Sequence, residues 1–287
     1  NLWLWAQQEN SKHRQGVKAS KMLSLSWQKE RGVSRMSKIK VFAVRNVKEI
    51  LRDPLSYIFA LGFPVVMLII MTIVNNSIPP EAGMDIFELK NLAPGVVLFG
   101  FTFVMLFTAI LMAKDRCGSF LGRLYAAPVT AAQFITGYIA PIIVLGVLQC
   151  IITYAAALII GLVTGDSLSL GGMMLSIVLL LPCLLMFISL GLLFGGIFND
   201  KAAPGICSIL ITVATILGGV WMDIKTVGGG LFKVAEILPF YPAVALARGA
   251  VNGCSDGRGI ALIVTSIYAA AALLGAVLIF RKNMRKI

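Results

Sequence analysis

The sequence contains long segments that have no charged residue. Of its 287 residues, 58% are hydrophobic and only 13% are charged. A helix needs about 20 apolar residues to cross a hydrocarbon core of about 30 Å. Asp, Glu, Lys, Arg and His are absent from six such segments, at residues 57–74, 94–113, 139–163, 173–198, 204–222 and 260–280. The sequence therefore predicts an all-α integral membrane protein with six transmembrane helices.

The lack of ionisable residues in these segments bears on the energy source. Carriers driven by protons or ions usually keep an ionisable side chain at membrane depth, and many channels select ions with charged rings. Membrane-embedded enzymes would need catalytic polar sets there, so no catalytic residue is assigned. A sodium site made of backbone carbonyls needs no charge, which keeps a self-contained secondary carrier or channel as the alternative. The pattern favours a transport protein that another subunit energises.

Metal ligands and nucleotide motifs are also scarce. The only histidine is His13, and the five cysteines, Cys117, Cys150, Cys183, Cys207 and Cys254, show no ligand spacing. Only Cys254 is expected on the oxidising side, so no internal disulfide is expected. No Gly-x-x-x-x-Gly-Lys-Ser/Thr motif occurs, which excludes ordinary P-loop binding of ATP. We expect no metal and no cofactor on this chain.

The charged residues lie outside the apolar segments, and they give a net charge of +12. Lys and Arg number five at residues 36–56, three at 114–136, one (Lys201) at 198–203 and four at 281–287, whereas the intervening connections carry one (Lys90), none, and four spread through the long outer segment. Cytoplasmic loops of membrane proteins carry such an excess. We therefore predict a plasma (inner) membrane protein with both termini cytoplasmic. A charge distributed over helix ends does not predict a nucleic-acid surface.

The first 35 residues differ from the rest. They are basic and rich in Gln and Ser, and they include three of the four tryptophans. We expect residues 1–35 to be a disordered extension or the product of a start assigned too early. The alternative is a tail on the anionic inner leaflet. The six-span domain then covers residues 36–287.

Residues 37–53 form an amphipathic pattern directly before the first span. Ile39, Phe42, Val47 and Ile50 recur at helical spacing between basic residues. This pattern predicts an elbow helix lying in the cytoplasmic interface, which ends where Pro54 breaks it. A helix that recruits a calmodulin-like partner is the alternative.

The connection between the second and third spans is the most distinctive polar segment. Phe120, Leu121, Leu124 and Tyr125 form an apolar stripe beside Arg123, and Thr130 is suited to cap the following helix. The pattern fits a short cytoplasmic helix that docks another protein. It equally fits a simple turn at the inner leaflet.

Two spans carry faces of small or hydroxylated residues. Such faces let helices approach closely. The functional interpretation is a subunit interface or the lining of a pathway, and the alternative is ordinary packing between helices of the same chain. Gly191 and Gly195 form a single GxxxG in the fourth span, which is a weak signal. The residues of the two faces are Thr102, Met105 and Thr108 in the second span, and Gly205, Ser208, Thr212, Thr215 and Gly219 in the fifth.

The outer segment, residues 223–258, contains a triple glycine and two prolines. We read it as short helices at the outer surface, partly re-entrant, that cap the exit of a pathway. Its aromatic and proline-rich part, residues 238–242, suits the headgroup interface.

The order of these parts is similar to that of a known family. The cytoplasmic connection has the form G-[ST]-F-x-x-R-L-x-x-x-P, and the outer segment has the form L-P-x-x-P-x-x-x-x-x-R ending at Arg248. With the elbow and six spans, residues 36–287 resemble the membrane (permease) subunit of a type-2 ABC exporter, from the permease family of drug, polysaccharide and lipid-linked export. One departure is that Asp115 replaces the usual acidic run, which bears on how an acidic contact to the ATPase is made.

The resemblance implies a machine of two permeases and two copies of a separate P-loop ATP-binding subunit, which carries ATP and Mg. The second permease is a second copy or a sister chain. Residues 115–128 would be the coupling helix that contacts the ATPase, and the second and fifth spans would line a central cleft. The faces predict a hydrophobic or amphipathic, drug-like or lipid-like cargo, with polysaccharide or peptide as the alternative. The coupling residues implied are Asp115, Gly118, Ser119, Phe120, Arg123, Leu124 and Pro128.

Overall fold

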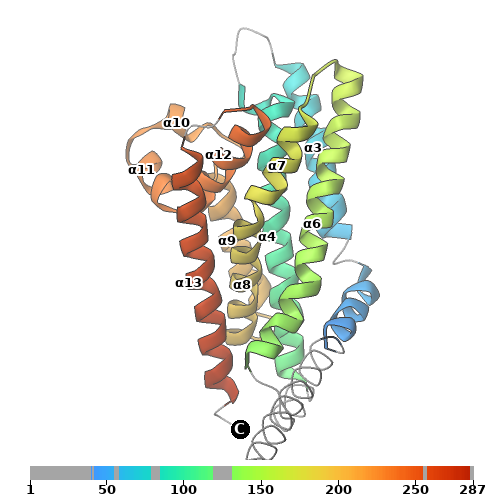
Figure 1. The fold of residues 1–287 in the computed structure, drawn as a ribbon, viewed down its shortest axis with the longest axis vertical. Coiled ribbons are helices and arrows are strands. Elements are labelled where there is room, and N and C mark those ends of the chain that lie inside the picture. Colours follow the sequence, from blue (N-terminus) through green and yellow to red (C-terminus); the bar gives the residue numbers. More distant parts are fainter. Residues whose placement is uncertain are drawn as a thin grey trace, which may run out of the picture.

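In the computed structural model, the described residues are 40, 42–54, 58–78, 85–118, 131–254 and 257–284, and those in regular structure are helical (Figure 1). The all-α class predicted from the sequence is confirmed for this part of the chain. The 1–35 extension lies outside the described residues. So do five of the expected coupling residues, Ser119, Phe120, Arg123, Leu124 and Pro128.

Four helical segments are long and apolar enough to cross a membrane by themselves within the described part of the chain. Two bent helix pairs pass the same test when each is counted as one span, which gives up to six. The four are a π-turn (Ile58–Gly62) continued by α3 (Phe63–Ser77), α4 (Leu89–Cys117), α6 (Ala131–Thr164) and α13 (Arg258–Met284).

The fourth predicted segment folds as two helices, α7 (Leu170–Leu179) and α8 (Leu181–Ile197), which meet at 42°. Pro182 lies in the first turn of α8. A proline there has no N–H to donate and clashes with the preceding turn, so a continuous helix bends or breaks at this point. The bend is therefore encoded locally.

The fifth predicted segment is shorter than expected. The helix α9 (Ala203–Leu217) has 15 residues, or about 22 Å at 1.5 Å per residue. The chain then turns through Gly219, whose φ is +64°. The assumption that Gly219 continues the helical face of Gly205 and Ser208 is therefore wrong, because the helix has already ended.

The outer segment folds as α10 (Ile224–Val227), α11 (Gly229–Ile237) and α12 (Phe240–Val251). The axes of α11 and α12 differ by 81° across Leu238-Pro239. These helices gather at one end of the molecule, whereas the end of α13 and the elbow helix lie at the opposite end (Figure 1).

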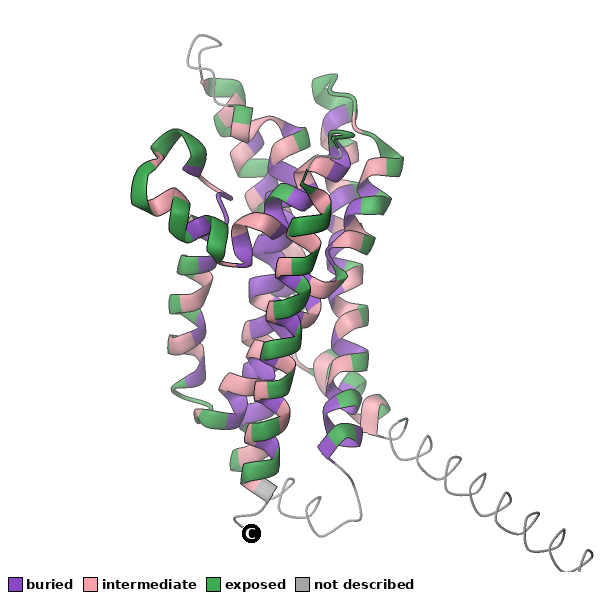
Figure 2. Cartoon of the chain, turned by 60° about the vertical axis from the view of Figure 1, so that its left-hand side comes forward, coloured by how far each residue is buried: buried purple, intermediate pink, exposed green. Residues whose placement is uncertain are grey.

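The core is built around α4. It contacts α3, α6, α8, α9 and α12, and buried residues concentrate at the centre of the bundle (Figure 2). Gly191 and Gly195 of α8 permit a close approach to the α4 backbone. A Cβ on Gly191 would lie 2.5 Å from the Met105 carbonyl oxygen, and one on Gly195 would lie 2.4 Å from that of Ala109. The weak GxxxG signal thus marks the contact between α8 and α4.

Candidate functional site: the inner helix junction

The elbow helix, residues 42–52, packs against the start of α6. The ring of Phe42 lies 5.1 Å from those of Phe134 and Tyr138. At Gly137 a Cβ would lie 2.3 Å from the Phe42 ring, so only glycine admits this approach. Asn46 is fully buried, and its Nδ2 donates to the Gly137 carbonyl oxygen at 3.0 Å. Phe42 and Asn46 of the predicted elbow are therefore docked on α6, whereas Val47, assigned to the same apolar pattern, is exposed.

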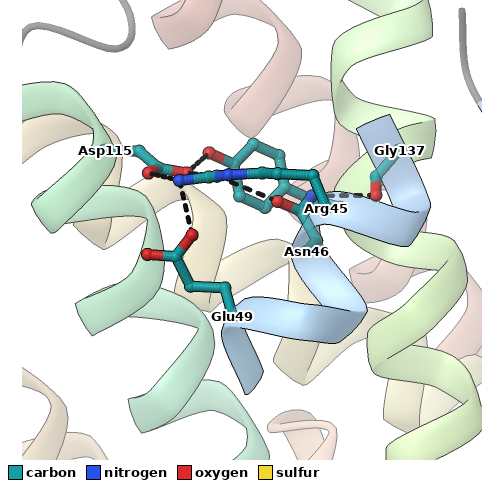
Figure 3. A network of polar contacts seen from close by, with 6 residues as sticks. Arg45, Asn46, Glu49, Asp115 and Gly137 are labelled. Carbon is teal, nitrogen blue, oxygen red and sulfur yellow. Dashed lines mark hydrogen bonds and ion pairs between the residues drawn. The ribbon is translucent and has the colours of Figure 1, made fainter. Parts of the chain in front are cut away.

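The elbow also binds the end of α4 through charge. Arg45 Nη2 donates to Asp115 Oδ1 at 2.6 Å, and Arg45 Nη1 donates to Asp115 Oδ2 at 2.5 Å (Figure 3). The Tyr138 hydroxyl donates to the same Oδ2. Paired hydrogen bonds between guanidinium and carboxylate are among the stronger and more directional contacts in proteins. We call Arg45, Asn46, Asp115, Gly137 and Tyr138 the inner junction.

Because the inner junction is largely buried, Arg45 and Asp115 each stabilise the charged form of the other. Asp115 is 4% exposed, whereas the Arg45 side chain is 28% exposed and also pairs with Glu49 at 2.6 Å. Burial lowers the pKa of Arg45, but its hydrogen bond to Asp115 and the charges of Asp115 and Glu49 outweigh this and raise that pKa above its ordinary value. The guanidinium therefore stays charged. Asp115 without Arg45 would be a buried carboxylate held by one hydroxyl, which is costly.

This geometry changes the interpretation of Asp115. The sequence pointed to a contact with the ATPase, but in the structure the carboxylate is buried and faces Arg45 and Tyr138 of its own chain. Gly118 is exposed and follows the last turn of α4, and its N–H donates to the Lys114 carbonyl oxygen at 3.0 Å. The described part of the predicted coupling helix is thus the end of α4.

The face predicted on the second span lies in the interior. Thr102, Met105 and Thr108 are each at most 1% exposed. The Thr102 and Thr108 hydroxyls donate to the Phe99 and Val104 carbonyl oxygens of their own helix. These side chains therefore pack inside the protomer. The partly exposed stripe of α4 is a different one: Phe103, Leu106, Phe107, Ile110 and Leu111.

The face predicted on α9 is partly open. Gly205, Ser208 and Thr212 are exposed, whereas Thr215 is buried. The Ser208 hydroxyl donates to the Pro204 carbonyl oxygen and that of Thr212 to Ser208, so both are satisfied within the helix. The exposed apolar residues Ile209, Val213 and Ile216 lie on the same helix. This side of α9 has no partner among the described residues.

Sequence reasoning did not single out four members of the inner junction, Arg45, Asn46, Gly137 and Tyr138. One signal was available: Asp115 is the only acid between the second and third spans, and the basic elbow is expected at the same membrane surface. The pairing itself joins residues 70 positions apart, which a single sequence does not reveal.

A second arginine fastens the opposite end of α4. Arg248 of α12 donates from Nε to the Asn91 carbonyl oxygen and from Nη2 to the Gly219 carbonyl oxygen, both at 2.9 Å. Asn252 Nδ2 adds a bond of 2.9 Å to Asn91 Oδ1. We call this set the outer clamp. It joins the outer segment to α4 and to the turn after α9.

The fold and both fastenings define a multi-pass helical membrane protein in which a docked elbow helix precedes the spans. The family model for the ABC-2 type transporter matches residues 37–252, which is most of the chain. The chain therefore belongs to the ABC-2 type transporter family, as its membrane permease domain. A search of curated proteins found no match. A permease domain of this family has no ATPase activity and holds no cofactor, because nucleotide binds to the ABC ATPase subunit with which it pairs.

Proposed function

We propose that this chain is half of the translocation pathway of an ATP-driven exporter made of two permeases and two ATP-binding subunits. The observation that carries the proposal is the inner junction. The segment expected to contact the ATPase connects α4 to α6, and the junction binds the adjoining ends of both helices to the elbow.

The mechanism that this arrangement supports is alternating access. Closure of the ATPase dimer would displace the coupling segment 115–128. Because Arg45, Asp115 and Tyr138 fasten three helices together, that displacement would reach α4, α6 and the elbow as one unit rather than bend a single helix end. Packed helices pass on such shifts because close-packed interiors deform little.

The proposed orientation places both termini and the inner junction in the cytoplasm and the outer clamp outside. Two observations support it. Basic residues gather at the end of the bundle that holds the elbow, and the end of α13 lies at that same end (Figure 1).

The proposed pathway face combines the open stripes of α4 and α9, which are neighbouring helices. Phe103 and Leu106 contribute aromatic and aliphatic surface, and Ser208 and Thr212 contribute a mildly polar edge. Such a surface suits a hydrophobic or amphipathic drug-like or lipid-like cargo better than a phosphate-rich one. The facing wall would come from a second copy of this chain or a sister permease.

The test is affinity purification of the tagged full-length chain from its native membrane in mild detergent, followed by mass spectrometry. The expected result is a P-loop ATPase in a 1:1 ratio with total permease, which the Leu124→Asp variant loses. A second permease in the eluate would identify a heterodimer. Absence of any ATPase across several detergents, with gradient-driven flux through the chain alone, would contradict the proposal and support a self-contained carrier.

A further inference from the structure

A cavity of about 380 Å³ lies between the elbow helix, α4 and α6, beside the inner junction. Small-molecule sites typically measure about 300–1,000 Å³, so the space is sufficient for part of a ligand. Its walls are apolar side chains of the two long helices, including Phe107 and Leu111 of α4 and Ile142 of α6. The acyl chain of a ligand could pack against these side chains.

The rim of this cavity carries equal numbers of both charges. Arg52 and Lys114 are basic, and Glu49 and Asp53 are acidic. Glu49 pairs with Arg45 at 2.6 Å, whereas Lys114 Nζ lies 3.9 Å from Asp53 Oδ2, at the limit of an ion pair. Among the described residues, Arg52 has no hydrogen-bond or ion-pair partner and is exposed. The rim therefore has a cationic group that is available to a ligand.

Apolar walls below a rim of mixed charge match one chemical class of membrane molecule. We propose that this cavity binds a zwitterionic phospholipid with a primary amine, of the phosphatidylethanolamine type. Its phosphate would contact Arg52 and Lys114, since both side chains are suited to phosphate. Its ammonium would lie near Glu49 and Asp53, and one acyl chain would lie against Phe107 and Leu111.

The rim charges also discriminate between headgroups. A headgroup with only negative charge would meet the two carboxylates, and like charges repel more strongly where water is partly excluded. A choline headgroup keeps the positive charge but has no N–H, whereas a primary ammonium has three donors for carboxylate oxygens. The expected order of retention is ethanolamine, then choline, then glycerol.

The proposed lipid site rests on the proposed membrane topology, because that topology places the elbow at the level of the lipid headgroups. It does not depend on ATP-driven export. Lipid retention is measured on the permease without any ATPase, so a failed lipid experiment leaves the exporter proposal intact. Failure to recover an ATPase likewise leaves the lipid site intact.

The test uses the full-length chain reconstituted with equal amounts of phosphatidylethanolamine, phosphatidylcholine and phosphatidylglycerol, then extracted in mild detergent for native mass spectrometry. We expect one tightly held phosphatidylethanolamine per chain, enriched about fivefold over phosphatidylcholine, which corresponds to roughly 1 kcal/mol, and enriched further over phosphatidylglycerol. Equal retention of the three lipids, or a preference for phosphatidylglycerol, would overturn the proposal.

Two variants test whether the lipid occupies this cavity. Arg52→Gln removes the available phosphate contact, and Leu111→Trp fills the apolar space while leaving the rim charges; each should abolish the enrichment. Lys48→Gln is the matched control, because it removes the same charge from the same helix outside this cavity. Enrichment that survives in both test variants, each with the thermal stability of the wild type, would contradict the assignment.

Discussion

Arginines fasten the two ends of α4 in different ways. At the inner end, Arg45 binds the carboxylate of Asp115, so both partners are side chains. At the outer end, Arg248 binds the carbonyl oxygens of Asn91 and Gly219, so both acceptors are backbone. Side chains can exchange partners through rotamer changes, whereas a backbone acceptor moves only with its helix or turn. The inner junction is therefore suited to transmitting motion and the outer clamp to fixing structure.

Between these ends, the middle of α4 packs closely against α8. Disrupting this contact gives the largest expected effect on stability. Gly195→Leu would place a side chain against the Ala109 carbonyl oxygen, 2.4 Å from the new Cβ, with no flexible group to yield. We expect a loss of about 3 kcal/mol or more in unfolding free energy. The measurement is thermal unfolding in detergent, followed by reaction of a thiol dye with the buried Cys150, Cys183 and Cys207.

Gly171→Leu is the control for this substitution, because a Cβ on Gly171 meets no atom within 4 Å. Its unfolding temperature should match that of the wild type. If the two variants unfold at the same temperature, the close contact of α8 with α4 is not a main source of stability.

At the outer clamp, Arg248→Ala removes the donors to two carbonyl oxygens. An unsatisfied buried acceptor costs about 1–3 kcal/mol, so we expect a loss of about 2–3 kcal/mol in stability. Transport per ATP by the molecules that remain folded should change little. Thermal unfolding and transport in proteoliposomes measure the two effects separately. An Arg248→Ala variant that is stable but transports poorly would contradict the structural role assigned to the outer clamp.

At the inner junction, Asp115→Ala should reduce transport per ATP more than it reduces stability, the reverse of Arg248→Ala. Arg45 is partly exposed and keeps Glu49, so we expect a loss of only about 1–2 kcal/mol in stability. Transport per ATP should fall steeply, because the elbow loses its arginine–carboxylate pair with the end of α4. A double-mutant cycle with Arg45→Ala should give a coupling energy of about 1–3 kcal/mol, and additive effects would contradict a direct interaction.

The smallest predicted effect concerns the turn that presents one acceptor of the outer clamp. Gly219 has φ of +64°, where a residue with a Cβ costs about 1–2 kcal/mol. Gly219→Ala should therefore lower stability by about 1 kcal/mol without removing the Arg248 bonds. Gly205→Ala is the matched substitution in the same unfolding experiment, because Gly205 lies within α9 and a Cβ there meets no atom within 4 Å. Equal unfolding temperatures for the two variants would contradict a strained turn.

The sequence allowed the fold class to be predicted, and a helix covers residues 42–52, where the elbow is expected. Uncharged runs and Pro54 are local signals, and local physics determines them. It did not reveal which face of each span is buried. The spans are apolar all round, so no amphipathic pattern distinguishes a core face from a lipid face. This is why Thr102, Met105 and Thr108, assigned to a pathway, pack inside the protomer.

The candidate site was predictable in location but not in its contacts. Asp115 was predicted to begin a coupling helix after the second span, whereas it lies in the last turn of α4, and its partner Arg45 lies 70 residues earlier. The sharp bend between α11 and α12 and the acceptors of Arg248 likewise depend on tertiary packing. Long-range pairing of this kind is decided by the whole fold rather than by local propensity.

The central claim is that the inner junction couples the ATPase to the spans. The most direct measurement is the number of cargo molecules moved per ATP hydrolysed, in proteoliposomes that contain the partner ATPase, for Asp115→Asn against the surface control Lys48→Gln. The account predicts that Asp115→Asn lowers this ratio about tenfold, or roughly 1.4 kcal/mol, while ATP hydrolysis continues and Lys48→Gln matches the wild type. A wild-type ratio in Asp115→Asn would contradict it.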